Sequence, residues 1–200
     1  MELNIQKDQN LDDDDVSPAS RPPKFVLDSV IYNGEDINFI LDQLKESTGD
    51  NDFAFELIYR ATRDGDINFH KFCDDKGPNI SLIKSNKNQI FGGYTKLSWA
   101  ETGAFKNDDT SFLFSLTNSK IYKIKNATYG IYNVNQTYIM SYGYPDGILL
   151  FDKFLTKDTN RAYIEGNCYY YNTDESSKVN LGGSDTFICE EVEVYKVIKI

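Results

Sequence analysis

The residues best suited to nucleophilic chemistry lie one helical turn apart, at His70 and Cys73. His70 is the only histidine of the chain, so any mechanism with a histidine base would have to use it. Cys73, however, shares a side of the predicted helix with the apolar Phe69 and Phe72, where a thiol is typically an inert core residue with a raised pKa. We therefore predict that both residues are structural and that the chain has no catalytic residue.

A pair of glycines, Gly92 and Gly93, could bind phosphate, because glycine-rich loops cradle phosphate groups. Such loops join a strand to a helix and continue with another glycine or with a lysine beside serine or threonine. Here the glycines lie between Phe91 and Tyr94, inside a predicted strand. Glycines within strands mark a bulge or the close approach of another backbone or bulky side chain. We predict this role, and no cofactor.

Carboxylates and tyrosines supply two weaker candidates. The two acids of a glycoside hydrolase could come from Asp64, Asp66, Glu101 and Glu165. Because the chain holds 31 acidic residues, a chance pairing carries no weight. A stacking surface for sugars or bases could come from Tyr163, Tyr169, Tyr170 and Tyr171. Alternate residues of a strand face opposite sides, so we expect these rings to be divided between core and surface.

Charge and cysteine content restrict the partners and the compartment. The 200 residues carry a formal net charge of -10, which disfavours phosphate backbones and anionic lipids and favours a basic protein surface. The three cysteines form no Cys-x-x-Cys pair, which argues against a disulfide framework and a zinc site. No window approaches the roughly 20 apolar residues of a spanning helix. We expect a cytoplasmic protein that binds no nucleic acid or metal and is not inserted in a membrane.

Residues 1–24 are predicted to form a disordered acidic tail. They combine Asp12–Asp15 with Pro18, Pro22 and Pro23 and have few apolar residues to offset the entropy of ordering. The acidic run lacks the ligand spacing and the glycine of a calcium loop. The rest of the chain, 25–200, is predicted to form one domain.

An amphipathic helix is predicted over Ile31–Ser47, with Glu35 and Asp36 near its start and Gly49 just past its end. Its apolar residues follow i, i+3, i+4 and i+7 spacing, at Ile37, Ile40, Leu41 and Leu44. We expect this apolar side to pack on the sheet of the domain itself. A second, short helix around Phe69 is expected to be capped by Asp64 or Asp66.

The remaining pattern is dominated by short strands. They are predicted at Phe53–Ala61, Asn79–Lys84, Gln89–Thr95, Ser111–Leu116, Lys120–Lys125, Gln136–Tyr142, Gly147–Phe151, Asn167–Tyr171 and Phe187–Ile200. Short strands without alternating long helices exclude a parallel sheet built from βαβ units. We predict a mainly β fold, α+β by count of elements, as a sandwich or barrel.

A series of motifs between Leu57 and Trp99 resembles the TLDc domain family. The series is Leu57–Gly65 (LIYRATRDG), Phe69–His70, Cys73–Asp74, Gly77–Lys84 (GPNISLIK), Phe91–Thr95 (FGGYT) and Trp99. The likeness continues in Ser111–Leu116 (SFLFSL) and in Glu191–Val197 (EVEVYKV), which resembles the closing strand of the family.

The resemblance implies a β-sandwich of two antiparallel sheets flanked by short helices. It also implies a non-enzymatic protein-binding domain that engages the cytosolic part of a vacuolar-type proton ATPase, is linked to oxidative-stress resistance, and lies at an organelle membrane only through its protein partner. The motif residues would be structural: Arg60, Asp64 and Gly65 at a turn and strand end, Gly92 and Gly93 in a sheet, and Phe91, Tyr94 and Trp99 beside them.

Two alternatives to a proton-pump regulator stay open. The first is a structural component of another large assembly, such as a cytoskeletal or ciliary array. The second is a hydrolase or a peroxide-handling enzyme that uses His70 and Cys73.

Overall fold

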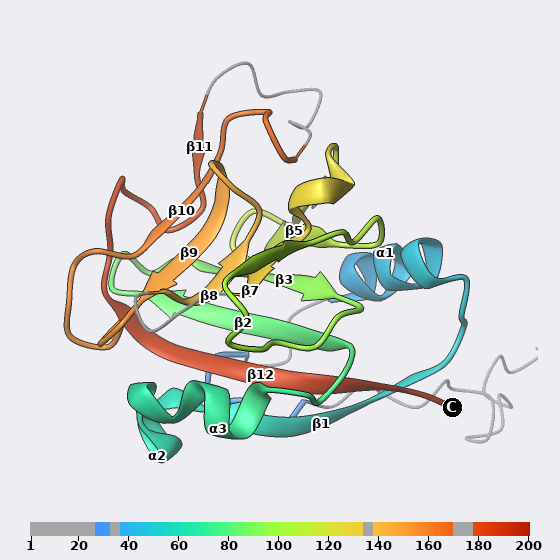
Figure 1. The fold of residues 1–200 in the computed structure, drawn as a ribbon, viewed down its shortest axis with the longest axis horizontal. Helices are drawn as coiled ribbons and strands as arrows, with labels where there is room; N and C mark the ends of the chain where they lie inside the picture. The colour runs from blue at the N-terminus through green and yellow to red at the C-terminus, as the bar shows by residue number, and fades with distance from the viewer. Residues whose placement is uncertain (1–26, 33–36, 134–137, 170–177) are drawn as a thin grey trace, which may run out of the picture.

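The computed structural model describes residues 27–32, 37–133, 138–169 and 178–200, and it contains two six-stranded antiparallel sheets (Figure 1). The first sheet has the order β1 (Phe53–Arg60), β12 (Cys189–Lys199), β2 (Asn79–Ser85), β3 (Ile90–Thr95), β5 (Phe112–Ser115) and β6 (Lys120–Lys123). The second sheet has the order β11 (Val179–Asn180), β10 (Arg161–Ile164), β9 (Gly147–Phe151), β8 (Tyr138–Tyr142), β7 (Ile131–Asn133) and β4 (Ala104–Lys106). The predicted mainly β fold with two antiparallel sheets is confirmed.

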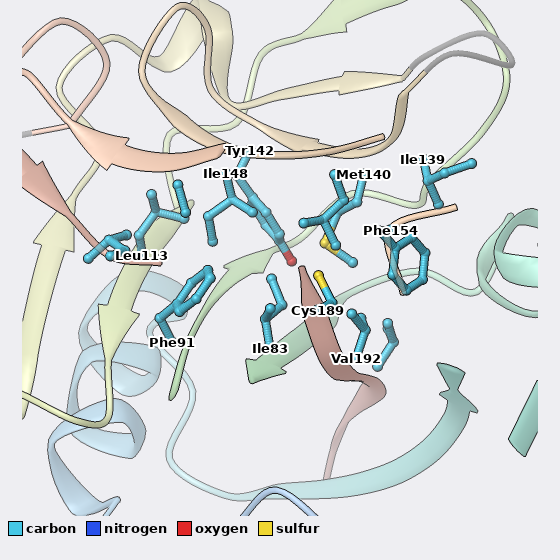
Figure 2. Packing of buried hydrophobic residues seen from close by; sticks show 14 of the residues in the cluster. Ile83, Phe91, Leu113, Ile139, Met140, Tyr142, Ile148, Phe154, Cys189 and Val192 are labelled. Atoms are coloured by element: carbon cyan, nitrogen blue, oxygen red, sulfur yellow. The ribbon is translucent and has the colours of Figure 1, made fainter. Parts of the chain in front are cut away.

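Side chains from both sheets form the main core. Figure 2 shows Ile83, Phe91 and Val192 of the first sheet facing Met140 and Ile148 of the second. All five are fully buried. Neighbouring residues of a strand point to opposite faces, so the residues next to Ile83, Phe91 and Val192 face away from this core. Their side chains are buried only if another element packs on the outer face of the first sheet.

Helix α1 (Asn38–Thr48) packs on the outer face of the first sheet. Ile40 and Leu44 of the helix lie in one buried cluster with Leu82, Phe114 and other residues of the sheet. The predicted packing of the helix on its own domain is therefore present. Gly49 ends the helix as predicted, with φ of 76° and its N–H donating to Lys45 O.

The predicted start of this helix at Ile31 is wrong. Ile31 and Tyr32 are not helical, because their N–H groups donate to Ser29 Oγ at 3.1 and 2.8 Å and close a turn there. Glu35 and Asp36, expected in the first helical turn, lie outside the described residues, as do residues 1–26 with the predicted acidic tail.

Two short α-helices and two 3-10 helices complete the described elements: α2 (Ala61–Asp64), η2 (Asp66–Asn68), α3 (Phe69–Cys73) and η3 (Ala127–Tyr129). In Figure 1, α2 and α3 lie beside β1 and β12. The expected cap of α3 by Asp64 or Asp66 is wrong, because the residue at the N-cap is Asn68 and it makes no side-chain cap.

The predicted strand Asn167–Tyr171 is also wrong within the described residues. Only Tyr169 forms an isolated bridge, with Ile124, and Tyr170 and Tyr171 lie outside the described part of the chain. The N–H groups of Asn167 and Cys168 donate to the buried carboxylate of Asp146 at 3.2 and 2.7 Å, which holds this segment as a loop. The sequence pattern also missed four short strands, β4, β7, β10 and β11.

Candidate functional site

The motif residues Arg60, Asp64 and Gly65 form the corner where β1 ends and α2 begins. Asp64 Oδ2 accepts the N–H of Arg60 at 2.9 Å, and Gly65 adopts φ of 84°, which favours glycine. The side chain of Arg63 donates to both carboxylate oxygens of Asp64, at 2.8 Å each. This hydrogen bond is the main reason that the pKa of Asp64 is lowered below its ordinary value. Arg60, Asp64 and Gly65 thus lie where a strand ends and the chain turns.

Arg60 also pairs with a carboxylate inside the protein. Its Nε lies 2.9 Å from Glu193 Oε1, and the Glu193 side chain is completely buried. Glu193 accepts three more hydrogen bonds, from Ser29 Oγ at 2.5 Å, Val30 N at 2.9 Å and Tyr195 OH at 2.8 Å. Arg60 Nη2 donates to Asp28 O at 2.7 Å. The ion pair thus fastens residues 28–30 to β1 and β12.

A second carboxylate of β12, Glu191, is hydrogen-bonded to α2. It accepts the N–H of Thr62 at 3.1 Å and the N–H of Val192 at 2.9 Å, and the Thr62 hydroxyl also donates to it. Sequence alternation gave no signal for either buried acid, because a glutamate in a strand is ordinarily exposed. Only the pairing of β12 between β1 and β2 places these acids inside.

Gly92 and Gly93 of β3 lie where a side chain has no room. A Cβ on Gly92 would be 1.8 Å from the carbonyl oxygen of Ser81 and 2.6 Å from Cζ of Phe114. A Cβ on Gly93 would be 2.8 Å from Cδ2 of Leu113 and 3.1 Å from the ring of Tyr142. The two glycines allow close approach on opposite faces of the first sheet, and they do not form a loop at a helix N-terminus.

Gly93 makes space for a tyrosine that joins the two sheets. Tyr142 of β8 is fully buried, and its hydroxyl donates to Gly93 O at 2.9 Å and lies 3.1 Å from Ser81 Oγ. The motif residue Trp99 packs edge-on against the ring at 5.1 Å and donates from Nε1 to Asn79 Oδ1 at 3.0 Å. Burial raises the pKa of Tyr142. The sequence did not single out Tyr142, since one tyrosine among 14 carries no signal.

The two aromatic residues beside the glycines are buried on opposite faces of β3. Phe91 packs edge-on against Phe187 in the main core, with ring centroids 5.5 Å apart. Tyr94 stacks on Phe112 at 5.4 Å in the cluster under α1. The eight motif residues therefore fall into two groups, one at the Arg60 corner and one between and beneath the sheets.

His70 and Cys73 do not form a nucleophilic pair. His70 Nδ1 lies 2.9 Å from Asp74 Oδ1, and Nε2 lies 4.0 Å from Glu101 Oε1. Cys73 is 1% exposed, and burial raises its pKa well above the ordinary value, so the thiolate needed for attack is not formed near neutrality. All three cysteines are buried and free. In the described ranges no group of histidine, cysteine and acidic side chains could hold a metal ion.

The acids of the hydrolase candidate are engaged with other groups. Asp64 accepts hydrogen bonds from Arg60 N and from the Arg63 side chain, and Glu101 Oε1 lies 4.0 Å from His70 Nε2. Tyr169 is fully buried, whereas the ring of Tyr163 is partly exposed. A shared stacking surface of these two tyrosines is therefore excluded.

An apolar pocket lies between α1 and the outer face of the first sheet. It is lined by Leu27, Tyr32, Ile37, Ile40, Leu41, Phe55, Ile80, Leu82, Phe114 and Leu116. These ten described residues include no carboxylate, imidazole, thiol or amine. The pocket is part of the packing of α1 and offers no acid, base or strong nucleophile.

Comparison with known proteins gives two findings. The model of the TLDc domain family matches residues 25–198. MTOR-associated protein MEAK7 of Danio rerio is 41% identical over 44 residues, which is 22% of this chain and 10% of that protein. The chain therefore aligns with a tenth of the length of this relative. Among the described helices, none is both long and apolar enough to cross a membrane.

Proposed function

The chain belongs to the TLDc domain family, and on that premise we propose that it is a non-enzymatic protein-binding domain that regulates a vacuolar-type proton ATPase through the cytosolic part of the pump. The match over residues 25–198, nearly the whole chain, is the observation that carries this proposal. It brings with it the family's association with the proton pump and with oxidative-stress resistance. A cytoplasmic location, at an organelle membrane only through the pump, belongs to the same proposal.

The absence of an assembled nucleophile supports a binding role. Within the described residues, the histidine is engaged by Asp74, the thiols are buried, and the paired glycines face side chains and backbone of the sheets. The name of the relative, MTOR-associated protein MEAK7, describes an association with another protein, which supports the same class of function for this chain.

Affinity purification from lysate tests the proposal directly. The tagged full chain is captured in buffer that preserves the assembled proton pump, at about 50 and 300 mM salt. The matched bait is an unrelated acidic domain with the same net charge of -10, which reports attraction by charge alone. We expect pump subunits on the chain and not on the control at both salt concentrations.

A functional measurement completes the test. Purified pump is incubated with the chain, and its ATP hydrolysis and its assembly on a native gel are followed. We expect either quantity to change in proportion to the chain that binds. Recovery of no pump subunits, or binding without any change in hydrolysis or assembly, contradicts regulation of the pump by this domain.

A further inference from the structure

The outer face of the second sheet carries connected aromatic rings. Phe105 of β4 stacks on Tyr132 of β7 with centroids 4.5 Å apart, and Tyr138 of β8 lies 4.8 Å from Phe151 of β9. Tyr132 and Tyr138 join the two pairs at 6.4 Å. Tyr129 and Tyr144 flank Phe105 at 5.1 and 5.9 Å. We call Phe105, Tyr129, Tyr132, Tyr138, Tyr144 and Phe151 the aromatic face.

Tyr132 and Phe151 point away from the core, because their strand neighbours Ile131 and Leu150 are fully buried between the sheets and alternate residues of a strand face opposite sides. Tyr129, in η3, is partly buried and packs against the main core. Phe105 is 39% exposed and Tyr144 is 48% exposed. The free face of an antiparallel sheet is ordinarily polar, whereas aromatic residues are enriched where proteins bind one another. The first sheet has α1 over its outer face, whereas β4 of the second sheet contacts the single helical turn η3, which carries Tyr129 itself.

The aromatic face ends at a strand with an open edge. β4 is the last strand of the second sheet and pairs, among the described residues, only with β7. All three of its residues are exposed. An edge strand of this kind offers backbone N–H and C=O groups to an extended segment of another chain. The ring of Phe105, the middle residue of β4, would then lie beside the side chains of that segment.

The negative net charge of the chain indicates that the bound segment is basic. The chain carries a net charge of -10, so it attracts basic partners at long range. None of the six aromatic-face residues is charged, and ring faces attract arginine and lysine at short range. The same sheet already holds such a contact, with Lys178 Nζ 4.4 Å from the ring centroid of Tyr163. Lys106 follows Phe105 in β4, and strand alternation turns its side chain to the other face.

We propose that the aromatic face and the edge of β4 bind an extended, arginine-containing segment of a partner protein. The backbone of the segment pairs with β4, and its arginine side chains stack on Phe105 and Tyr144. This inference rests on the proposed protein-binding role, and it does not depend on the proton pump being the partner.

The test is an NMR titration of the isotope-labelled full chain with a synthetic peptide. The probe is a ten-residue peptide of alternating arginine and valine with blocked ends. One control peptide has glutamate in place of every arginine, and a second has proline in place of the central valine, which removes a backbone donor. We expect the first peptide to shift the signals of residues 104–106 and 144, and each control to bind at least tenfold more weakly.

Two matched variants assign the contact to the aromatic face. The double variant F105A/Y144A should bind the arginine peptide at least tenfold more weakly, as truncated aromatic anchors do. I67A removes an apolar side chain that is 77% exposed elsewhere and should bind like the unmodified chain. Melting temperatures within about 2 °C of the unmodified chain show that both variants fold.

Several results overturn the proposal. They are no shift at millimolar arginine peptide, equal binding of the glutamate or proline peptide, unchanged binding by F105A/Y144A, and a self-associated dimer whose formation protects β4. Because the peptide is synthetic, its result is decided separately from capture of the proton pump. Failure of the surface and failure of the proposed function can therefore be told apart.

Discussion

Replacing Gly92 by alanine should destabilise the fold more than any other single methyl group added to the motif glycines. The new Cβ would lie 1.8 Å from Ser81 O, whereas unstrained carbon contacts lie near 3.5 Å. The obstructing atom belongs to the backbone of β2, which is held between β12 and β3, so it cannot move aside as the end of a side chain can. The strand must shift, or the β2–β3 ladder must open locally.

The magnitude follows from the size of this overlap. Overpacking of a well-packed interior costs about 1–3 kcal/mol, and a backbone clash in a central strand belongs at the upper end. We expect Gly92→Ala to lower the free energy of unfolding by about 3 kcal/mol. At roughly 2–4 °C for each kcal/mol in a domain of this size, the melting temperature should fall by about 6–12 °C.

Three further variants serve as references for the stability of Gly92→Ala. Gly93→Ala meets the end of the Leu113 side chain at 2.8 Å and should cost less, about 1–2 kcal/mol. Gly103→Ala meets nothing within 4 Å and has φ of 66°, so only backbone strain of about 1 kcal/mol is expected. Glu101→Gln, on a side chain that is 51% exposed, should melt within about 1 °C of the unmodified chain.

The measurement is thermal and urea unfolding of these variants under identical conditions, with valine at Gly92 and Gly93 as more severe versions. The order of stability should be Glu101→Gln, Gly103→Ala, Gly93→Ala and Gly92→Ala, from most to least stable. If Gly92→Ala melts within about 2 °C of the unmodified chain, the close approach of β2 and β3 at this glycine is refuted.

Three more predictions follow from the buried charges and thiols. Arg60→Met should lower the free energy of unfolding in urea by about 3 kcal/mol, because it leaves Glu193 buried without its cation. Adding Glu193→Gln should restore part of that free energy, and additive losses in the double variant would contradict a coupled pair. Since the pKa of Asp64 is lowered below 3.8 in the folded state, its charge stabilises the fold above that pH, and this stabilisation is lost as the pH falls through the lowered pKa. Asp64→Asn should therefore cost about 1 kcal/mol at pH 6 and progressively less below pH 3.8, and a difference that stays constant with pH would exclude the charge as its cause. In the native protein at pH 7.5, all three thiols should react with a thiol reagent at least a hundredfold more slowly than in 6 M guanidinium chloride. The reason is that burial raises the pKa of Cys73 and raises that of Cys168 to about 11. One fast-reacting native thiol would favour the peroxide-handling alternative.

Local patterns in the sequence predict those elements whose signals are themselves local. The end of α1 at Gly49 follows from a glycine with positive φ, and the β2–β3 hairpin follows from two strand patterns joined by a short polar loop. Ser85 N donates to Gln89 O across that loop, and Asn88 has φ of 58°. These features depend on residues within a few positions of one another, which is why a single sequence is enough to place them.

The features that the sequence pattern missed depend on distant residues. Glu193 is buried because Arg60, Ser29 and Tyr195 surround it, and Arg60 and Ser29 are 133 and 164 positions away. The loop at Asn167 is held by Asp146 and not by a neighbouring strand. At Glu193 several contacts, most of them long-range, bury a strand residue that alternation places outside, and at Asn167 and Cys168 hydrogen bonds to Asp146 replace strand pairing.

The same distinction separates the residues that identify the family from those that could meet a partner. Phe91, Tyr94 and Trp99 are at most 2% exposed, and the two glycines beside them face neighbouring strands, so a partner cannot touch these side chains. They make one arrangement of two sheets stable, and that arrangement brings together rings that are far apart in the chain. Phe105 and Tyr144 become neighbours because β7 pairs with β4 on one side and with β8, which ends just before Tyr144, on the other. The interior part of the motif therefore specifies the scaffold, and partner choice has to be encoded in residues that the scaffold places on its surface.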